Sequence, residues 1–225
     1  MTYPTDALSK DKPQMTNKSN LIIKVCGMRD ADNIQAVDSL APVDWMGFIF
    51  YPPSPRFVSH RPAVMPNRCK RAGIFVDAAT EEIIDHQSLY SLDIIQLHGH
   101  ETGDYCQQLR STLPEGTSII KTVQVSSPDD ILQTAPFEGL TDFLLFETRC
   151  DSYGGSGQQF DWDMLHLYQG TTPFILSGGI GPSDTAKVQA FSHPMLAGID
   201  LNSKFETAPA VKDIQTLTSF IDSLH

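Results

Sequence analysis

The chain has 225 residues, 40% of them hydrophobic, with 16 Lys and Arg against 27 Asp and Glu, a formal net charge of −11 at pH 7. This length can bury a full core, and the negative charge argues against nucleic acid or an anionic membrane surface as a partner. The four cysteines include no Cys-x-x-Cys pair, and no apolar run approaches the ~20 residues of a membrane helix. We therefore expect a soluble, cytoplasmic protein without disulfides or a zinc site.

The first 20 residues are rich in Lys, Asp, Ser, Thr, Asn and Pro and show almost no apolar periodicity. Such a segment cannot bury enough surface to offset the entropy lost when it orders. We predict a disordered N-terminal extension over 1–20 and one catalytic domain over 21–225.

From Leu21 onward, short β-rich runs alternate with helical patterns. The expected strands cover 22–26, 45–50, 72–76, 94–98, 118–123, 143–147, 174–177 and 196–201. The expected helices cover 30–40, 80–90, 101–113, 128–134, 161–168, 182–191 and 211–224, with a further helical pattern over 61–68 that Pro62 and Pro66 interrupt.

Strands that alternate with helices pair in parallel through right-handed crossovers. Eight such units in this length match the lower end of the size range of the closed (β/α)₈ TIM barrel, the α/β fold that we predict. An open doubly wound sheet is the alternative, but it usually has fewer strands and would not explain reactive residues at so many strand ends.

The first strand ends in Cys26, at a place where α/β enzymes present catalytic groups. Residues two apart on a strand share a face, so if Cys26 points into the barrel, Lys24 does too. A lysine inside a barrel needs a carboxylate. Asp77, Glu147 and Asp200 all lie at strand ends and are the candidates.

Two adjacent loops suggest a phosphate site. The glycine-rich turn 177–182 follows the seventh strand and opens a helix, so that small residues let backbone N–H groups approach an anion at the positive helix end. The eighth strand then ends in polar residues that add donors. We expect the phosphate cradle to include Gly178, Gly179, Asn202 and Ser203, an ordinary tight connection being the alternative.

Three further features stand at strand ends. The glycine-rich turn 153–157 follows the sixth strand and is either a flexible connector or a lid over substrate. Arg56 follows a stiff proline-rich segment and either receives a carboxylate or is solvated. His98 ends the fourth strand, where we expect a group of the pocket wall or a structural group, with a catalyst as the alternative. Cys69, Cys106 and Cys150 are expected to be bystanders.

These segments together resemble the phosphoribosylanthranilate isomerase family over 21–225. The motifs that carry the resemblance occur in the same order: 24–27, 47–56, 73–77, 96–99, 153–157 with 160–162, 177–179 and 198–203. The resemblance implies a TIM-barrel enzyme that uses neither metal nor organic cofactor. Its reaction is an Amadori rearrangement of N-(5-phosphoribosyl)anthranilate to 1-(2-carboxyphenylamino)-1-deoxyribulose 5-phosphate in tryptophan biosynthesis. The expected partner is this phosphorylated aminosugar, and the expected assembly is a monomer or homodimer.

The resemblance also implies roles for individual residues. Cys26 matches the family's base and Glu147 its acid, Arg56 matches the group that receives the anthranilate carboxylate, and Asp200 matches one that binds the sugar. A free thiol has a pKa of about 8.5, so we expect Lys24 to help Cys26 toward the thiolate. Glu147 must instead keep its proton, which burial or a neighbouring Asp200 could arrange.

The family ordinarily has Asp at the acid position, where this chain has Glu147. The extra methylene moves the carboxyl by roughly 1 to 1.5 Å, and a misplacement of about 1 Å can cost on the order of 10²-fold in rate. Lys204 and Ala210 also replace glycines common in the family. Two alternatives therefore stay open: a related sugar-phosphate isomerisation, such as that of the histidine pathway, and a barrel that binds its phosphorylated ligand with weakened or no catalysis.

Overall fold

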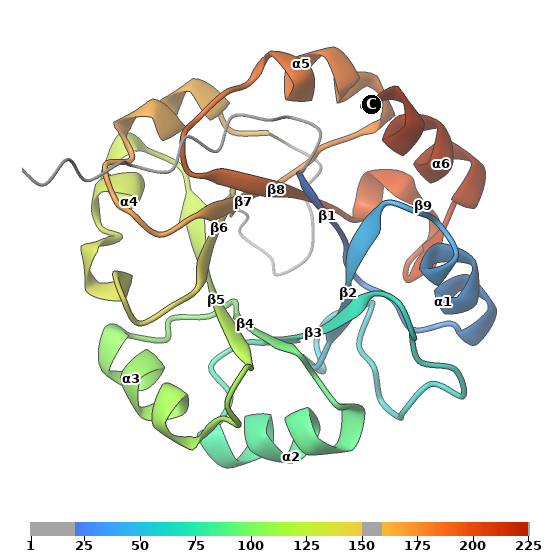
Figure 1. The fold of residues 1–225 in the computed structure, drawn as a ribbon, viewed down its shortest axis with the longest axis horizontal. Helices are drawn as coiled ribbons and strands as arrows, with labels where there is room; N and C mark the ends of the chain where they lie inside the picture. The colour runs from blue at the N-terminus through green and yellow to red at the C-terminus, as the bar shows by residue number, and fades with distance from the viewer. Residues whose placement is uncertain (1–20, 150–158, 225) are drawn as a thin grey trace, which may run out of the picture.

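The structure is a computed structural model, and it describes residues 21–149 and 159–224. Eight parallel strands close into a barrel in chain order, with β1 hydrogen-bonded to both β2 and β8. Figure 1 looks along the barrel, with the helices in a ring outside the strands. The predicted TIM barrel is therefore confirmed, and the open doubly wound sheet is wrong. The extension over 1–20, the turn 153–157 and Cys150 lie outside the described residues.

All eight expected strands form, with ends that differ by a few residues from the prediction. They are β1 (Ile22–Val25), β2 (Val43–Ile49), β3 (Lys70–Phe75), β4 (Ile94–Leu97), β5 (Ser118–Val125), β6 (Phe143–Thr148), β7 (Phe174–Leu176) and β8 (Leu196–Leu201).

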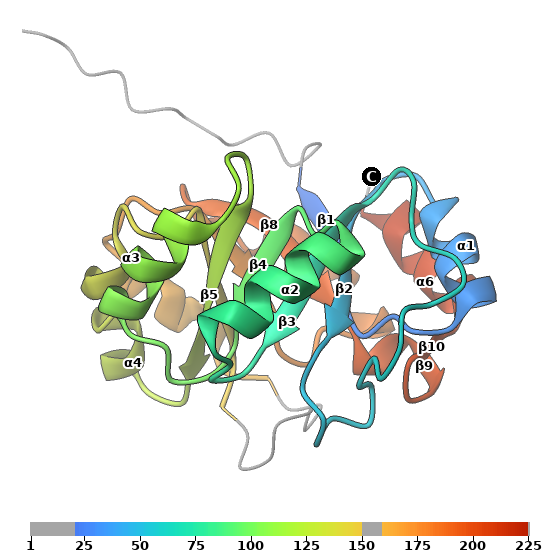
Figure 2. The same cartoon turned by 90° about the horizontal axis from the view of Figure 1, so that it is seen from below.

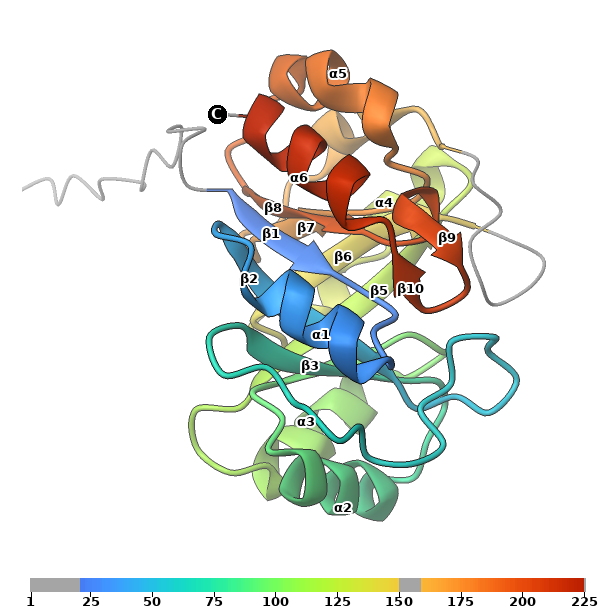
Figure 3. The same ribbon diagram turned by 90° about the vertical axis from the view of Figure 1, so that its right-hand side faces the viewer.

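The α-helices are α1 (Ala31–Asp38), α2 (Thr80–Tyr90), α3 (Gly103–Thr112), α4 (Pro128–Leu132), α5 (Thr185–Ala190) and α6 (Ile214–Ser223). The 3₁₀ helices are η2 (Ala135–Phe137), η3 (Trp162–Leu167), η4 (Pro182–Asp184) and η5 (Ser203–Phe205), and a small antiparallel sheet pairs β9 (Glu206–Ala208) with β10 (Val211–Lys212). Figures 1 and 3 show α6 between α5 and α1 on the outside of the barrel.

The helix expected over 61–68 is wrong, because this segment runs as a loop. Pro62 and Pro66 have no backbone N–H to donate to a helix. Arg71 donates from Nε and Nη2 to the Pro66 carbonyl oxygen at 3.1 and 2.8 Å. A side chain from β3 thus donates to a carbonyl oxygen that would accept a backbone N–H in a helix.

Other expected helices are shorter or of another type. Residues 161–168 form only the 3₁₀ helix η3, the helix expected over 128–134 stops at Leu132, and the one expected over 182–191 is divided into η4 and α5. The last helix, expected from 211, begins only after Asp213, whose carboxylate caps it by accepting the Thr216 N–H at 3.0 Å. Val211 and Lys212 before it form β10.

The strand side chains alternate between two cores. Ile23 and Val25 point outward and pack in the large core beneath the helices, as do Leu144 and Phe146, whereas Leu145 points inward. The side chains thus alternate with the period of two of a β-strand, and Lys24, between Ile23 and Val25, points into the barrel as expected. The inner core is filled by residues among the first three of their strands: Trp45, Ala72, Ile94, Ile120, Leu145, Ile175 and Ala197.

Apolar packing therefore fills the barrel near the amino ends of the strands, and polar residues occupy the carboxyl ends. Figure 2 shows the barrel from the side, with the start of β1 at the upper edge and the β9–β10 hairpin toward the lower edge, where β1 ends. The 3₁₀ helix η5 connects β8 to this hairpin, and Glu206 of β9 binds Arg56 in the loop after β2.

Candidate active site

One pocket at the carboxyl ends of the strands brings the predicted site residues together. Among the residues that line it are the nine that the sequence singled out: Cys26, Arg56, His98, Glu147, Gly178, Gly179, Asp200, Asn202 and Ser203. They come from six different strands or the loops that follow them, as expected of a TIM barrel whose site is built on its βα loops.

Lys24 is fully buried inside the barrel, and its carboxylate partner is Asp200. The two residues pair in register on β1 and β8, and Lys24 Nζ lies 2.9 Å from Asp200 Oδ1. Asp200 also accepts the Ser177 hydroxyl at 3.2 Å. Burial opposes the charge of Lys24, but the adjacent Asp200 outweighs it and, with a smaller effect of Cys26, raises the pKa of Lys24.

Cys26 lies directly beyond this pair at the end of β1. The thiol has room because β2 carries Gly47 beside it; a Cβ there would lie 2.7 Å from the Cys26 sulfur. Burial raises the pKa of Cys26, Lys24 opposes that rise, and Asp200 adds to it. Lys24 thus acts in the expected direction, toward the thiolate, and burial opposes it as the larger effect.

Glu147 projects from β6, and its partner is His98 at the end of β4. The distance from Glu147 Oε1 to His98 Nε2 is 3.1 Å, with side chains 22% and 17% exposed respectively. Asp200, which the sequence offered as a neighbour of Glu147, instead binds Lys24 and Ser177. Glu147 is therefore paired with a base rather than with a second carboxylate.

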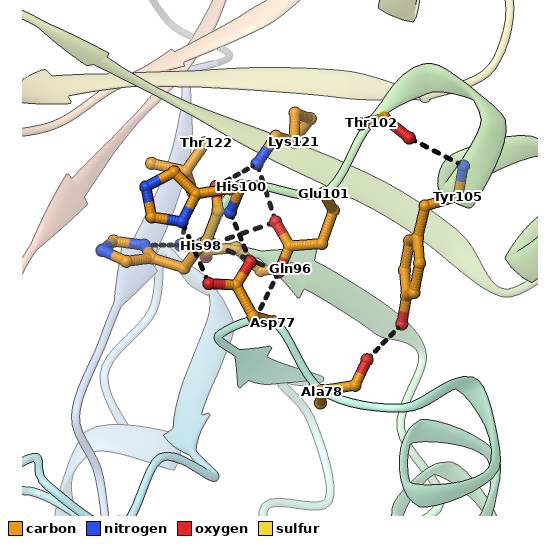
Figure 4. A network of polar contacts seen from close by, with 11 residues as sticks. Asp77, Ala78, Gln96, His98, His100, Glu101, Thr102, Tyr105, Lys121 and Thr122 are labelled. Carbon is orange, nitrogen blue, oxygen red and sulfur yellow. Dashed lines mark hydrogen bonds and ion pairs between the residues drawn. The ribbon is translucent and has the colours of Figure 1, made fainter.

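A buried ion pair holds the loop that carries His98 (Figure 4). Lys121 Nζ on β5 lies 2.7 Å from Glu101 Oε2, and both side chains are almost completely buried. Glu101 also accepts the backbone N–H groups of Asp77 and Gly99 at 2.9 and 3.0 Å. One carboxylate thus ties the loops after β3 and β4 to the middle of β5.

Arg56 is buried, so the alternative of a solvated arginine is wrong. Its Nε and Nη2 donate to Glu206 Oε1 and Oε2 at 2.9 and 2.6 Å, while Lys212 Nζ lies 2.6 Å from Glu206 Oε1 and 2.9 Å from Asn202 Oδ1. Burial would raise the pKa of Glu206, but the bond from Arg56 and the charge of Lys212 lower it. The sequence patterns missed Glu206 and Lys212, because both lie in the hairpin after the eighth strand, outside the expected strand ends.

The glycine loops have the backbone freedom that an anion site requires. Gly178 and Gly179 have φ angles of +87° and +72°, and a Cβ on Gly178 would lie 2.6 Å from the Thr148 nitrogen. The helix expected to open behind them begins with the three-residue 3₁₀ helix η4, and α5 follows it. The Gly181 N–H at the start of η4 donates to Asp184 Oδ2 at 2.7 Å, so it is not directed at an anion in the pocket. The backbone N–H groups of Gly178 and Gly179 are then the donors that this loop offers to an anion.

Ala210 occupies a position where the resemblance leads one to expect glycine. Its φ angle is +67°, in the left-handed region that disfavours side chains, and its N–H donates to Glu206 Oε1 at 3.2 Å. The substitution therefore strains the turn between β9 and β10 while it keeps the contact with Glu206. Lys204 lies in η5, beside Gly181.

Within 21–149 and 159–224, no three His, Cys, Asp or Glu side chains gather as metal ligands. None of the helices in that part of the chain is long and apolar enough to span a membrane.

Comparison with known proteins extends this picture. Residues 23–223 match the family model described as N-(5'-phosphoribosyl)anthranilate isomerase. The enzyme of that name from Phocaeicola vulgatus is 46% identical over 204 residues, which cover 91% of this chain and 98% of the relative.

Solved structures agree with the sequence relatives. Phosphoribosyl anthranilate isomerase from Thermotoga maritima is 27% identical, with a TM-score of 0.74 over 91% of this chain and 98% of that chain. A phosphoribosyl anthranilate isomerase in complex with reduced 1-(o-carboxyphenylamino)-1-deoxyribulose 5-phosphate is 25% identical, with a TM-score of 0.70 over the same shares. This chain therefore belongs to the N-(5'-phosphoribosyl)anthranilate isomerase family.

Proposed function

We propose that this protein converts N-(5'-phosphoribosyl)anthranilate to 1-(2-carboxyphenylamino)-1-deoxyribulose 5-phosphate, with Cys26 as the base and Glu147 as the acid. The observation that carries the proposal is that a thiol and a carboxyl group from β1 and β6 line one pocket together with Arg56 and the glycine loop. Membership of the isomerase family makes this the reaction in question.

The reaction requires two proton transfers at different atoms. Glu147 gives a proton to the furanose ring oxygen, the bond from C1′ to that oxygen breaks, and the ring opens to an iminium. The Cys26 thiolate then takes the proton from C2′ to give an enolamine, which tautomerises to the ketose. C1′ is reduced as C2′ is oxidised, so the rearrangement needs no external oxidant or reductant.

The rest of the pocket fits the two anionic ends of this substrate. Arg56 holds Glu206 through Nε and Nη2, and none of the hydrogen bonds within the described residues uses Nη1. That nitrogen can receive the anthranilate carboxylate without release of Glu206. We assign the phosphate to the backbone N–H groups of 178–179 and 202–203, which line the same pocket.

The base chemistry also bears on where the protein works. A thiol base must stay reduced, and the three described cysteines, Cys26, Cys69 and Cys106, are free. We therefore place the reaction in a reducing compartment, the cytoplasm.

The test is a steady-state assay of purified protein with N-(5'-phosphoribosyl)anthranilate. Because general acid and base catalysis contribute roughly 10²- to 10⁴-fold each, Cys26→Ala and Glu147→Gln should each lower kcat at least ~100-fold, with KM little changed. Cys69→Ala, which removes a thiol outside the pocket, is the matched control. Undiminished turnover in either catalytic variant would remove that residue from the mechanism, and an inactive wild type would overturn the function.

A further inference from the structure

We propose that His98 is the proton partner of Glu147, so that the acid of this site is a hydrogen-bonded histidine–glutamate pair rather than a lone carboxyl group. This inference rests on the proposed function and adds a positioning residue to it. The evidence comes from the geometry of the pair, from the side chains around His98 and from the length of the acidic residue.

The pair spans one intervening strand. His98 follows β4 and Glu147 lies on β6, with β5 hydrogen-bonded between them. Glu147 Oε1 nevertheless reaches to 3.1 Å from His98 Nε2. An aspartate on the same backbone would be shorter by one carbon–carbon bond, roughly 1.5 Å. The glutamate in this chain thus supplies the reach that the contact needs.

The other nitrogen of His98 faces an amide that suits either protonation state. Gln96 Nε2 lies 3.3 Å from His98 Nδ1 and 3.2 Å from Thr122 Oγ1, and Gln96 Oε1 is buried without a partner in the described part of the chain. In this orientation the amide donates to a neutral imidazole. If the amide turns over, Oε1 accepts from the Nδ1–H of an imidazolium and from the Thr122 hydroxyl.

The charges that face His98 come from three strands. Burial lowers the pKa of His98, but Glu147 on β6 raises it by charge and hydrogen bond, and this outweighs Lys24 on β1 and Lys121 on β5. Both lysines are bound to carboxylates of their own, Asp200 and Glu101. The net effect raises the pKa of His98 above its ordinary value of 6.5, so the contact with Glu147 favours the protonated imidazole.

The proton balance of the step is then complete. The proton on His98 Nε2 passes to Glu147 as Glu147 protonates the furanose oxygen, which leaves a neutral imidazole beside a carboxylate. Cys26 finishes with the proton from C2′, and transfer from this thiol to the pair through solvent restores both groups. His98 does not touch the reacting atoms in this scheme, because Glu147 lies between them.

The variant that isolates this role is His98→Gln. Glutamine can still donate an amide N–H to Glu147, so the carboxyl group can stay in place, but it cannot hold a proton. We expect kcat at pH 7 to fall about 10- to 100-fold with KM changed less than about threefold. His60→Gln, an exposed histidine outside the pocket, is the matched control and should retain kcat within about twofold.

The pH profile separates proton holding from mere placement. The active form of the site has Cys26 ionised and the acid protonated. The ordinary pKa of a thiol, 9.0, lies above the 6.5 of histidine, and burial raises that of Cys26 further. With the base as the group of higher pKa, kcat rises with pH up to the pKa of the acid and falls above the pKa of Cys26. The rising break should lie above pH 6.5 in the wild type. In His98→Gln this break should move to a lower pH, because the variant has no imidazole to hold the proton, and the plateau above it should be lower.

An NMR titration of the imidazole tests the pair without any turnover. The His98 signal, assigned by its loss in His98→Gln, should titrate above pH 6.5 in the wild type and at a lower pH in Glu147→Gln. Titration at the same pH in both proteins, or an unchanged kcat profile in His98→Gln, would overturn the pair. A wild type that does not isomerise the substrate would instead overturn the proposed function, while the titration would still decide the pair.

Discussion

Glu206 accepts hydrogen bonds from Arg56 with both carboxylate oxygens, from Nε to Oε1 at 2.9 Å and from Nη2 to Oε2 at 2.6 Å. Its Oε1 also accepts from Lys212 Nζ at 2.6 Å. A bidentate contact of this kind fixes the plane of the guanidinium group as well as its position. The orientation of the Arg56 side chain in the pocket is therefore set by Glu206.

We predict that Glu206→Gln impairs binding more than chemistry. Arg56 would keep one neutral hydrogen bond but lose the fork that orients it, so KM should rise about 10-fold or more while kcat changes less. Steady-state kinetics measure both constants, and circular dichroism confirms that the variant folds. Glu115→Gln, an exposed change in the turn before β5, is the control. Equal KM values for Glu206→Gln and the wild type would show that Glu206 does not position Arg56.

A second prediction concerns the reactivity of Cys26. Because burial raises the pKa of this thiol, its alkylation by iodoacetamide should be slow at pH 7 and accelerate above pH 9. Lys24→Met should slow it further, because Lys24 opposes the rise. Mass spectrometry of the labelled protein follows the rate, with Cys26→Ala as the background from the other cysteines. Rapid labelling at pH 7 would mean that the thiolate already forms in the resting site.

The Lys24–Asp200 pair leads to a prediction about stability. Loss of one partner leaves a buried charge unpaired, so Asp200→Asn should lower the free energy of unfolding by about 3–5 kcal/mol in urea titrations. The same change in Asp129→Asn, on the first turn of α4, should cost far less. A loss below about 1 kcal/mol for Asp200→Asn would argue that Lys24 finds other partners.

The same pair has a pH signature. The pKa of Lys24 is raised in the folded protein, so its contribution to stability is fully present below the ordinary value of 10.5 and is lost as the pH rises through the higher folded value. The unfolding free energy of the wild type should therefore decline above pH 10.5 more steeply than that of Lys24→Met. Parallel curves for the two proteins would contradict this linkage.

Ala210 offers a prediction in the opposite direction. Its φ of +67° is strained for alanine and ordinary for glycine, so Ala210→Gly should stabilise the protein by up to about 1 kcal/mol. Ala208→Gly, in β9 with no positive φ, should destabilise it by a similar amount. Thermal unfolding of both variants gives the comparison, and a lower Tm for Ala210→Gly would show that the strain is relieved elsewhere.

The local patterns of the sequence determined the barrel and the rim of its site. Alternating strand and helix signals predicted all eight strands, because hydrophobic periodicity and turn residues are properties of short segments. Residues at strand ends converge in a parallel barrel, which is why the nine predicted site residues, Cys26 and Glu147 among them, line one pocket. The helix predicted over 61–68 failed because Pro62 and Pro66 lack the N–H groups that a helix needs, and the Arg71 side chain binds the Pro66 carbonyl oxygen instead.

Only the tertiary structure decided which charged groups meet. Closure of the barrel brings β1 against β8 and so selects Asp200 from the three carboxylates offered to Lys24. The β9–β10 hairpin places Glu206 within hydrogen-bonding distance of Arg56. Glu147 extends across β5 and contacts His98. Burial, which cannot be derived from a local sequence pattern, raises the pKa of Cys26, although the neighbouring Lys24 lowers it. These relationships depend on distances between segments far apart in the chain, and electrostatic interactions act through those distances.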